Sequence, residues 1–253
     1  MIPYFIITTI HIGPIPVQVW GLMVAFGILA GVFAASKMAQ CRGLNKDVVW
    51  DLAAWVMVGA FVGARVAMLA YTPEVYLSDP FELLRVWHGG FSIFGGFIGA
   101  LTSGIWFLKK RNLGILSYSD IAVFGLPLGI FVGRIGCFLI HDHPGRLTDF
   151  LLGVRYVGGT RHDLGLYDCV VGLVLFMIFL MLARRKTKVG AYVVVFSIGY
   201  ALARFFFDFL RATDVAVPDA RYFGLTPAQY AAIIMLMFGA WVWAKLKTKT
   251  ATE

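Results

Sequence analysis

Apolar residues fill seven long windows of the chain, and short polar connections separate them. We place the windows at 17–38, 49–71, 91–108, 119–140, 165–183, 190–210 and 226–246. Each holds roughly 18–22 mostly apolar residues, the length an α-helix needs to cross a ~30 Å hydrocarbon core. The pattern predicts an all-α, polytopic membrane protein with seven transmembrane helices. No soluble domain of useful size remains between the windows, so we expect one integral-membrane domain over residues 1–253.

Composition supports this interpretation. Hydrophobic residues make up 60% of the chain and charged residues 14%, and mean hydropathy is +0.80, far from the globular average. The cysteines Cys41, Cys137 and Cys169 lack the spacing of a metal site or a disulfide framework. We therefore interpret them as ordinary buried thiols.

Lysine and arginine are distributed unevenly between alternate connections. The inner connections (39–48, 109–118 and 184–189), with their flanks and the C-terminal tail, carry thirteen: Lys37, Arg42, Lys46, Lys109, Lys110, Arg111, Arg184, Arg185, Lys186, Lys188, Lys245, Lys247 and Lys249. The outer connections (72–90, 141–164 and 211–225) carry six: Arg85, Arg146, Arg155, Arg161, Arg211 and Arg221. Because cytoplasmic loops are enriched in Lys and Arg, we expect an outside N-terminus and a cytoplasmic C-terminus. The net charge of +8 then mostly reflects topology, and no nucleic acid partner is expected.

Three arginines, Arg65, Arg134 and Arg204, lie inside apolar windows. A guanidinium at bilayer depth costs at least ~2.5–3.5 kcal/mol on insertion scales, so it usually faces a cavity or an anionic partner. It stays charged, and its planar fork matches phosphate oxygens. We therefore predict a site for an anionic head group, most simply that of a phospholipid. Tyr200, one helical turn before Arg204, could donate to the same phosphate or be an ordinary buried tyrosine.

Two of these arginines also have structural interpretations. Asp208 lies one helical turn after Arg204 and could form a salt bridge with it. Arg65 could equally be a packing anchor, paired with Asp51 or Asp168.

The longest outer connection opens with a run of polar and turn-forming residues: His141, Asp142, His143, Pro144, Gly145 and Arg146. Such a run is compatible with a solvated turn, an acid–base pair or a metal site. Zinc is disfavoured, because the run supplies no third ligand nearby in sequence. A second unusual segment holds the glycine pairs 89–90 and 95–96, which favour close helix packing or a broken, cavity-lining backbone.

Five segments, in order along the chain, resemble those of bacterial prolipoprotein diacylglyceryl transferases. Residues 133–138, Gly-Arg-Ile-Gly-Cys-Phe, with the later Gly145-Arg146, resemble the signature Gly-Arg-x-Gly-Asn-Phe and its following Gly-Arg. Residues 63–65 and 87–96 are similar to the second-span Gly-x-Arg and the double Gly-Gly segment. Residues 161–168 and 200–211 resemble Arg-His-Pro-x-Gln-Leu-Tyr-Glu and Tyr-x-x-x-Arg-Phe-x-x-Glu-x-x-Arg. The resemblance covers nearly the whole chain.

The resemblance implies a multi-pass enzyme of the bacterial cytoplasmic (inner) membrane. Such enzymes transfer the diacylglyceryl group of phosphatidylglycerol to the lipobox cysteine thiol of a preprolipoprotein signal peptide. A thioether forms and glycerol phosphate is released, with no cofactor or metal. Buried guanidiniums suit this reaction, because they stabilise the charge of a phosphate leaving group. A transporter is disfavoured, because the two halves show no internal repeat, whereas a non-catalytic relative that binds phospholipid or lipoprotein precursor remains an alternative.

The chain departs from the family at chemically important positions. Phe94 stands where the family has a histidine before its second glycine pair, and Cys137 replaces the signature asparagine. A thiol needs a base or positive surroundings to ionise, and an acid beside a histidine can orient the imidazole. The predicted catalytic residues are therefore Arg134, Arg204, His141, Asp142 and His143, with His88 and His162 as further candidates. The predicted phospholipid-binding residues are Arg65, Arg134, Gly145, Arg146, Tyr200, Arg204, Gly89, Gly90, Gly95 and Gly96.

Overall fold

A computed structural model describes residues 1–185, 187–215 and 219–250. It is mostly helical and contains two compact units. Unit 1 comprises Met1–Met38 and Ser119–Glu253, and unit 2 comprises Ala39–Tyr118.

Five long helices form the body of unit 1: α1 (Val19–Cys41), α5 (Ile115–Ile140), α6 (Leu164–Ala183), α7 (Ala191–Phe207) and α8 (Pro227–Thr250). A short 3-10 helix, η3 (Asp208–Leu210), continues α7. Helices α1 and α5 approach closely through glycines, since a Cβ atom on Gly27 would lie 2.6 Å from the carbonyl oxygen of Gly129. Such small residues let the backbones of membrane helices pack directly.

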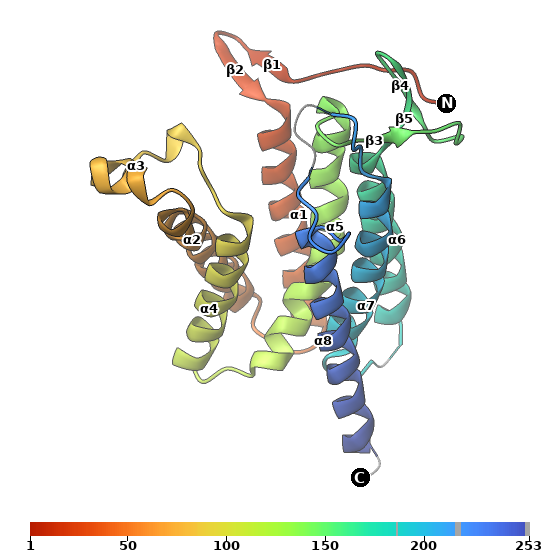
Figure 1. Ribbon diagram of the computed structural model, residues 1–253. Helices are drawn as coiled ribbons and strands as arrows, with labels where there is room; N and C mark the ends of the chain where they lie inside the picture. Colours follow the sequence, from red (N-terminus) through yellow and green to blue (C-terminus); the bar gives the residue numbers. More distant parts are fainter. Residues whose placement is uncertain (186, 216–218, 251–253) are drawn as a thin grey trace. The chain divides into compact units, whose positions relative to one another are not determined.

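Two small antiparallel sheets accompany these helices, and the sequence analysis did not predict them. Strands β1 (Thr9–Ile12) and β2 (Ile15–Gln18) form a hairpin before α1. Strands β3 (Pro144–Leu147), β4 (Val154–Tyr156) and β5 (Gly159–Asp163) pair in the order β3-β5-β4. The second sheet lies at the end of the helices where α5 stops and α6 starts (Figure 1). The predicted outer connection 141–164 is thus a folded sheet.

Unit 2 is a helix pair closed by a short cap. Helices α2 (Lys46–Tyr71) and α4 (Ile93–Lys110) pack against each other, and α3 (Pro73–Ser78), η1 (Pro80–Leu84) and η2 (Val86–His88) connect them. A Cβ atom on Gly63 would lie 2.4 Å from the carbonyl oxygen of Gly95. The pair therefore requires glycine on both helices.

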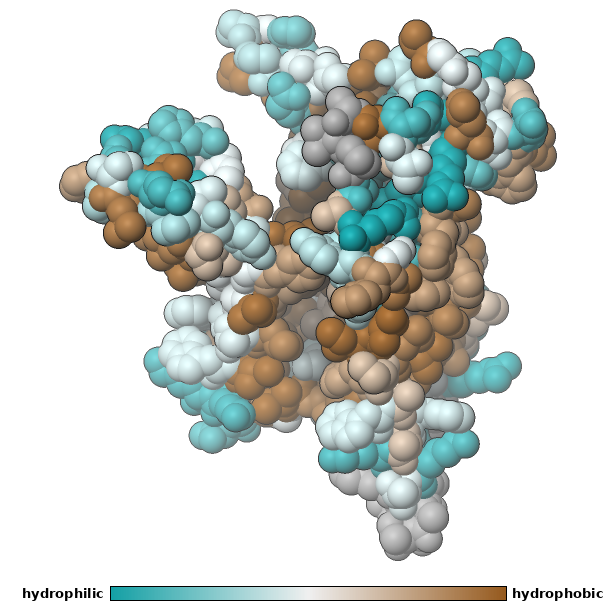
Figure 2. Space-filling model, in the orientation of Figure 1, coloured by the Kyte–Doolittle hydropathy of each residue, from teal (hydrophilic) through white to brown (hydrophobic). Residues whose placement is uncertain are grey.

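Six helices within the described residues are long and apolar enough to cross a membrane: α1, α2, α5, α6, α8 and α7 extended to Leu210. Helix α4, which matches the predicted window 91–108, is not among them. Apolar side chains cover the middle of unit 1, and polar ones gather at its ends (Figure 2). Cys137 and Cys169 are buried as expected, but Cys41 is exposed where α1 ends, which corrects its interpretation as a buried thiol.

Candidate functional site

Arg134 of α5 and Arg204 of α7 meet on one buried carboxylate, that of Asp168 on α6. Arg134 Nη2 lies 3.1 Å from Asp168 Oδ2, and Arg204 Nη1 lies 3.4 Å from the same oxygen. The Asp168 side chain is 1% exposed, whereas those of Arg134 and Arg204 are 24% and 14% exposed. Burying a carboxylate without a charged partner is very costly. The ion pairs with Asp168 therefore hold both guanidinium groups in place. The structure thus brings together the two arginines that were predicted to bind an anion.

A second carboxylate, that of Asp208, links Arg204 to Arg211. Asp208 Oδ1 lies 3.2 Å from Arg204 Nη2 and 2.9 Å from Arg211 Nε. The other Asp208 oxygen accepts a hydrogen bond from the Thr226 hydroxyl. Arg211 also pairs with Asp219, which is partly exposed. Arginines and carboxylates therefore alternate from the buried end of the cluster to solvent, and the Arg204–Asp208 salt bridge considered from the sequence is present.

Arg134 has the capacity to bind a further acceptor. Its Nη1 lies 3.7 Å from Cys137 Sγ, and its guanidinium also interacts with Tyr200. Among the described residues, Asp168, Cys137 and Tyr200 occupy at most three of its five N–H donors. Arg134 and Arg204 share Asp168, and of the two only Arg204 has a second carboxylate partner among the described residues, Asp208. The remaining donors suit a phosphate oxygen.

His141 lies in a closed aromatic cluster beyond the end of α5. Its Nδ1 is 2.6 Å from Asp163 Oδ2, and its side chain is 1% exposed. The ring of Tyr4 stacks on it, with centroids 4.8 Å apart. Tyr156 donates to the same carboxylate at 2.7 Å, and burial together with this hydrogen bond raises the pKa of Tyr156. His141 Nε2 is buried without a hydrogen-bond partner among the described residues, so this imidazole has no open side for a substrate.

His143 is the more accessible histidine of the same turn. Its Nδ1 lies 2.7 Å from Asp142 Oδ1, and both side chains are partly exposed. The backbone adopts a φ of 51° at His141, a left-handed conformation that sends the two imidazoles to different surroundings. Asp142 therefore contacts His143, whereas the acid beside His141 is Asp163. Asp142 is therefore placed to orient His143 but not His141.

Gly145 and Arg146 attach β3 to the segment that follows η3. A Cβ atom on Gly145 would lie 2.6 Å from the carbonyl oxygen of Leu210. Arg146 is exposed, and its Nε donates to the carbonyl oxygen of Arg211 at 3.4 Å. Both residues hold the β3-β5-β4 sheet beside Arg211.

His162 of β5 faces the start of α6. Its Nδ1 lies 2.6 Å from the hydroxyl oxygen of Tyr167. Burial lowers the pKa of His162, so its imidazole is uncharged at neutral pH. Since Tyr167 immediately precedes Asp168, His162 belongs to the packing around the N-terminal end of α6.

Arg65 of α2 is enclosed by the chain between α3 and α4. Its side chain is 6% exposed, and its five N–H groups have five backbone carbonyl acceptors: Glu82, Leu83, Arg85, Gly89 and Gly90. A guanidinium has five N–H donors, so the donor set of Arg65 is fully used. Asp51, considered above as its partner, pairs with Arg111 at 2.9 Å, and the carboxylate beside Arg65 is that of Glu82.

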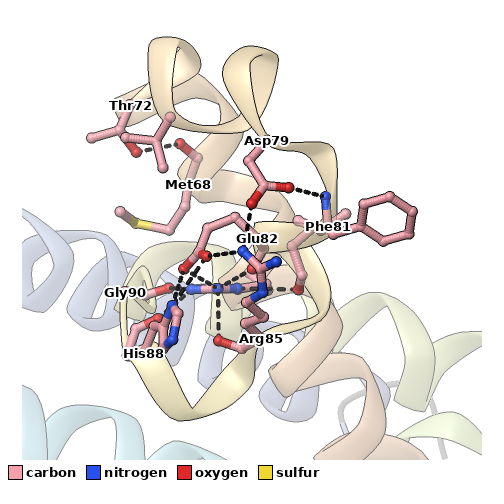
Figure 3. Close-up of polar contacts among 12 residues, drawn as sticks. Met68, Thr72, Asp79, Phe81, Glu82, Arg85, His88 and Gly90 are labelled. Atoms are coloured by element: carbon pink, nitrogen blue, oxygen red, sulfur yellow. Dashed lines mark hydrogen bonds and ion pairs between the residues drawn. The ribbon is translucent and has the colours of Figure 1, made fainter.

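Glu82 is the centre of the polar contacts in this cap (Figure 3). Its carboxylate lies 3.5 Å from Arg65 Nη2, 3.3 Å from Arg85 Nη1 and 2.9 Å from His88 Nδ1. Although burial opposes ionisation of Glu82, the hydrogen bonds from His88 and Arg85 and their charges lower its pKa. Arg85 also pairs with Asp79. The cap therefore neutralises its own charges.

The four glycines of unit 2 have conformational and packing roles. Gly89 and Gly90 adopt φ values of 77° and 73°, which favour glycine, and this turn directs both carbonyl groups to Arg65. Gly95 lies at the contact with α2, and a Cβ atom on Gly96 would lie 3.6 Å from the carbonyl oxygen of Ala60. The helix-packing interpretation therefore holds for Gly95 and Gly96, whereas Gly89 and Gly90 form a break in the helical backbone before α4.

Two acids that organise unit 1 were not predicted as site residues. Asp168 was considered only as a partner of Arg65, and Asp163 was not singled out. Asp163 also caps α6, because its Oδ1 accepts from the backbone N–H of Leu166 at 3.0 Å. The sequence positions of the two acids could have indicated their importance. Asp163 directly precedes an apolar window, as an N-cap residue does, and Asp168 lies within that window.

Comparison with known proteins identifies relatives of the whole chain. The family model described as prolipoprotein diacylglyceryl transferase matches residues 7–245. A Pseudoalteromonas atlantica protein named phosphatidylglycerol–prolipoprotein diacylglyceryl transferase is 32% identical, over 95% of this chain and 89% of the relative. Proteins of the same name from Nitratidesulfovibrio vulgaris (strain DP4) and Solidesulfovibrio magneticus are also 32% identical. These matches cover 92% and 96% of this chain and 91% and 95% of the relatives.

Proposed function

We infer, because the chain belongs to the prolipoprotein diacylglyceryl transferase family, that it transfers the diacylglyceryl group of phosphatidylglycerol to prolipoproteins. The family match over residues 7–245 includes parts of both compact units, which supports one transferase domain over residues 1–253. Within the site, the observation that carries the proposal is the convergence of Arg134 and Arg204 on Asp168.

The reaction joins a thiol sulfur to a glyceryl carbon. The lipobox cysteine attacks the carbon of the diacylglyceryl group that bears the phosphate ester, so a C–S bond forms as the C–O bond breaks. The departing oxygen takes the bonding electrons and leaves as glycerol phosphate. Arg134 and Arg204 stabilise this phosphate, and Tyr200, which interacts with Arg134, donates a hydrogen bond to it. Preorganised donors of this kind contribute about 10²–10³ each in rate.

The thiol proton requires an acceptor, and His143 is the better candidate of the histidine pair. The side chain of Phe94 cannot accept a proton, and His141 is enclosed between Asp163 and aromatic rings. His143 is partly exposed, and the Asp142 carboxylate 2.7 Å away can stabilise the imidazolium that forms. We therefore assign proton acceptance to His143 and a structural role to His141.

The positions of basic residues support the proposed topology within each unit. In unit 1, α1 and α6 begin and α5 ends beside the strands, and α7 ends and α8 begins on the side of the helices that faces them (Figure 1). Lys37, Arg184 and Lys245 are near the opposite helix ends. In unit 2, Lys46, Lys109 and Lys110 are likewise opposite the cap. With α4 as the seventh crossing, this arrangement gives an outside N-terminus and a cytoplasmic C-terminus in the bacterial inner membrane.

A reconstituted transfer assay tests the proposed function. The purified protein is placed in nanodiscs that contain phosphatidylglycerol labelled in its acyl chains, and a lipobox peptide is added. We expect the label to become covalently attached to the peptide, whereas a peptide with serine in place of the lipobox cysteine stays unlabelled. Binding of lipid or peptide without transfer would instead identify a non-catalytic relative.

A further inference from the structure

The cap of unit 2, residues 73–92, and the first residue of α4 present large apolar side chains on their outer surface. The most exposed of these are between 69% and 82% accessible: Leu77, Phe81, Leu84, Trp87 and Ile93. The ring of Phe81 points away from the polar cluster (Figure 3). Contiguous exposed apolar surface marks a contact with a membrane or a protein.

The charged groups of the cap are mostly paired with one another, and Glu82 is the one that is largely enclosed. Arg85 pairs with Asp79 and Glu82, and His88 pairs with Glu82. Asp79 also accepts from the backbone N–H of Phe81 at 3.1 Å. Among the described residues of the cap, Glu74, in the first turn of α3, is the acidic residue without an ion pair. The cap therefore pairs most of its charges within itself, while its large apolar side chains stay exposed.

Arg65 makes the backbone of this segment compatible with an apolar surrounding. In lipid, carbonyl groups outside regular helices must find partners within the protein. The five carbonyl oxygens that accept from Arg65 belong to three places in the cap. They are Glu82 and Leu83 in η1, Arg85 as its C-cap, and Gly89 and Gly90 in the turn before α4. One guanidinium thus satisfies five carbonyl groups, which explains why its full donor set is used within the chain.

The apolar surface of the cap is continuous with that of α2, whose last residue, Tyr71, is followed directly by the cap. Helix α2 is a candidate membrane span and exposes apolar side chains such as Phe61 and Leu69. Trp and Tyr favour the lipid–water boundary, and Tyr71 and Trp87 are both exposed in this region.

We propose that residues 73–93 form a cap embedded in the lipid–water interface, with Leu77, Phe81, Leu84, Trp87 and Ile93 in contact with the bilayer. Arg65 maintains the cap by binding its carbonyl groups. The partner of this surface is the lipid of the leaflet that α2 reaches at Tyr71. The outer connection 72–90, expected from the sequence to be periplasmic, is then a membrane-seated element and not a water-exposed loop.

Environment-sensitive probes on single cysteines test this proposal. In a Cys41→Ser background, Leu77→Cys and Leu84→Cys are labelled with a nitrobenzoxadiazole fluorophore and reconstituted in phosphatidylglycerol–phosphatidylcholine nanodiscs. Val157→Cys is the control, because Val157 is an apolar residue between β4 and β5 that is 96% exposed. Quenching by aqueous iodide is compared with quenching by lipid-attached nitroxides.

We expect the probes at 77 and 84 to be several-fold less sensitive to iodide than the probe at 157, and to be quenched strongly by lipid nitroxides. Iodide quenching equal to that at 157 would show a water-exposed loop and overturn the proposal. Protection from both quenchers would show a protein partner and overturn it equally. The measurement needs no turnover, so its failure is distinct from a failure of the transferase assignment.

A second comparison tests the part assigned to Arg65. With the probe at 84, Arg65→Gln should increase iodide quenching, because the carbonyl groups lose their donors. Arg65→Lys should increase it less, because an ammonium retains three donors. Arg155→Gln, which removes an exposed arginine of β4, is the matched control and should change nothing. Unchanged quenching in folded Arg65→Gln would remove Arg65 from the proposal.

Discussion

Replacing Arg134 or Arg204 with glutamine should abolish transfer while the protein stays folded. In Arg134→Gln, Asp168 keeps its contact with Arg204 at 3.4 Å. In Arg204→Gln, Asp168 keeps Arg134 at 3.1 Å, and Asp208 keeps Arg211 at 2.9 Å. Neither variant leaves a buried carboxylate without an arginine. The stability loss should therefore stay below the ~3–5 kcal/mol that follows when a buried ion is left without its partner.

The loss of activity should be much larger than the loss of stability. Removing one preorganised donor from a developing oxyanion costs about 10²–10³ in kcat, or roughly 2.7–4 kcal/mol. Lysine at either position should restore only part of the rate, because a point charge cannot reproduce the bidentate guanidinium. The double variant Arg134→Gln, Arg204→Gln leaves Asp168 without either arginine. It should therefore be destabilised by more than the sum of the single variants.

The assay combines transfer of labelled diacylglyceryl from phosphatidylglycerol to a lipobox peptide with thermal unfolding in the same detergent. Arg155→Gln is the matched control, since it removes an exposed arginine and should keep both activity and unfolding temperature. Full activity in either single glutamine variant would refute the phosphate site. Equal stability of the single and double variants would refute the shared role of Asp168.

Three further predictions concern topology and the histidines. Impermeant maleimide should label single cysteines in the outer connections 141–164 and 211–225 only from outside and those in the inner connections only after permeabilisation, and the reverse result for 141–164 would remove the proposed catalytic face. His143→Gln should lower the rate by about 10²–10⁴. His141→Gln should instead cost about 1–3 kcal/mol of stability by disturbing a buried hydrogen bond, and near-normal rates in both variants would leave thiol activation to the arginines alone. Burial lowers the pKa of His162 in the folded protein, so the unfolded protein takes up a proton more readily at this residue. The protein is therefore most stable above the unfolded pKa of ~6.5 and loses stability as the pH falls below that value. Unfolding midpoints between ~pH 7.5 and 5.5 should thus depend less on pH in His162→Gln, and an unchanged slope would contradict this.

The histidine turn illustrates how a local pattern can suggest a group without fixing its partners. From the sequence, His141 and His143 are equivalent neighbours of Asp142. In the structure, the left-handed backbone at His141 and the pairing of β3 with β5 bring Asp163, twenty-two residues later, to His141. The sheet consists of strands of three to five residues, too short to give a clear alternation of apolar and polar positions.

The membrane character, the family and the unusual status of three arginines can all be predicted from the order of the residues. Hydropathy and the cost of burying a charge act residue by residue, so Arg65, Arg134 and Arg204 stand out without a fold. Their different environments depend on residues distant in sequence. Asp168 lies 34 residues from Arg134 and 36 from Arg204, whereas the carbonyl groups around Arg65 belong to a cap 17–25 residues later. It is the folding of distant segments against one another that lets two guanidiniums share one carboxylate and keep donors for an anion, while the third uses all of its donors on backbone carbonyl groups.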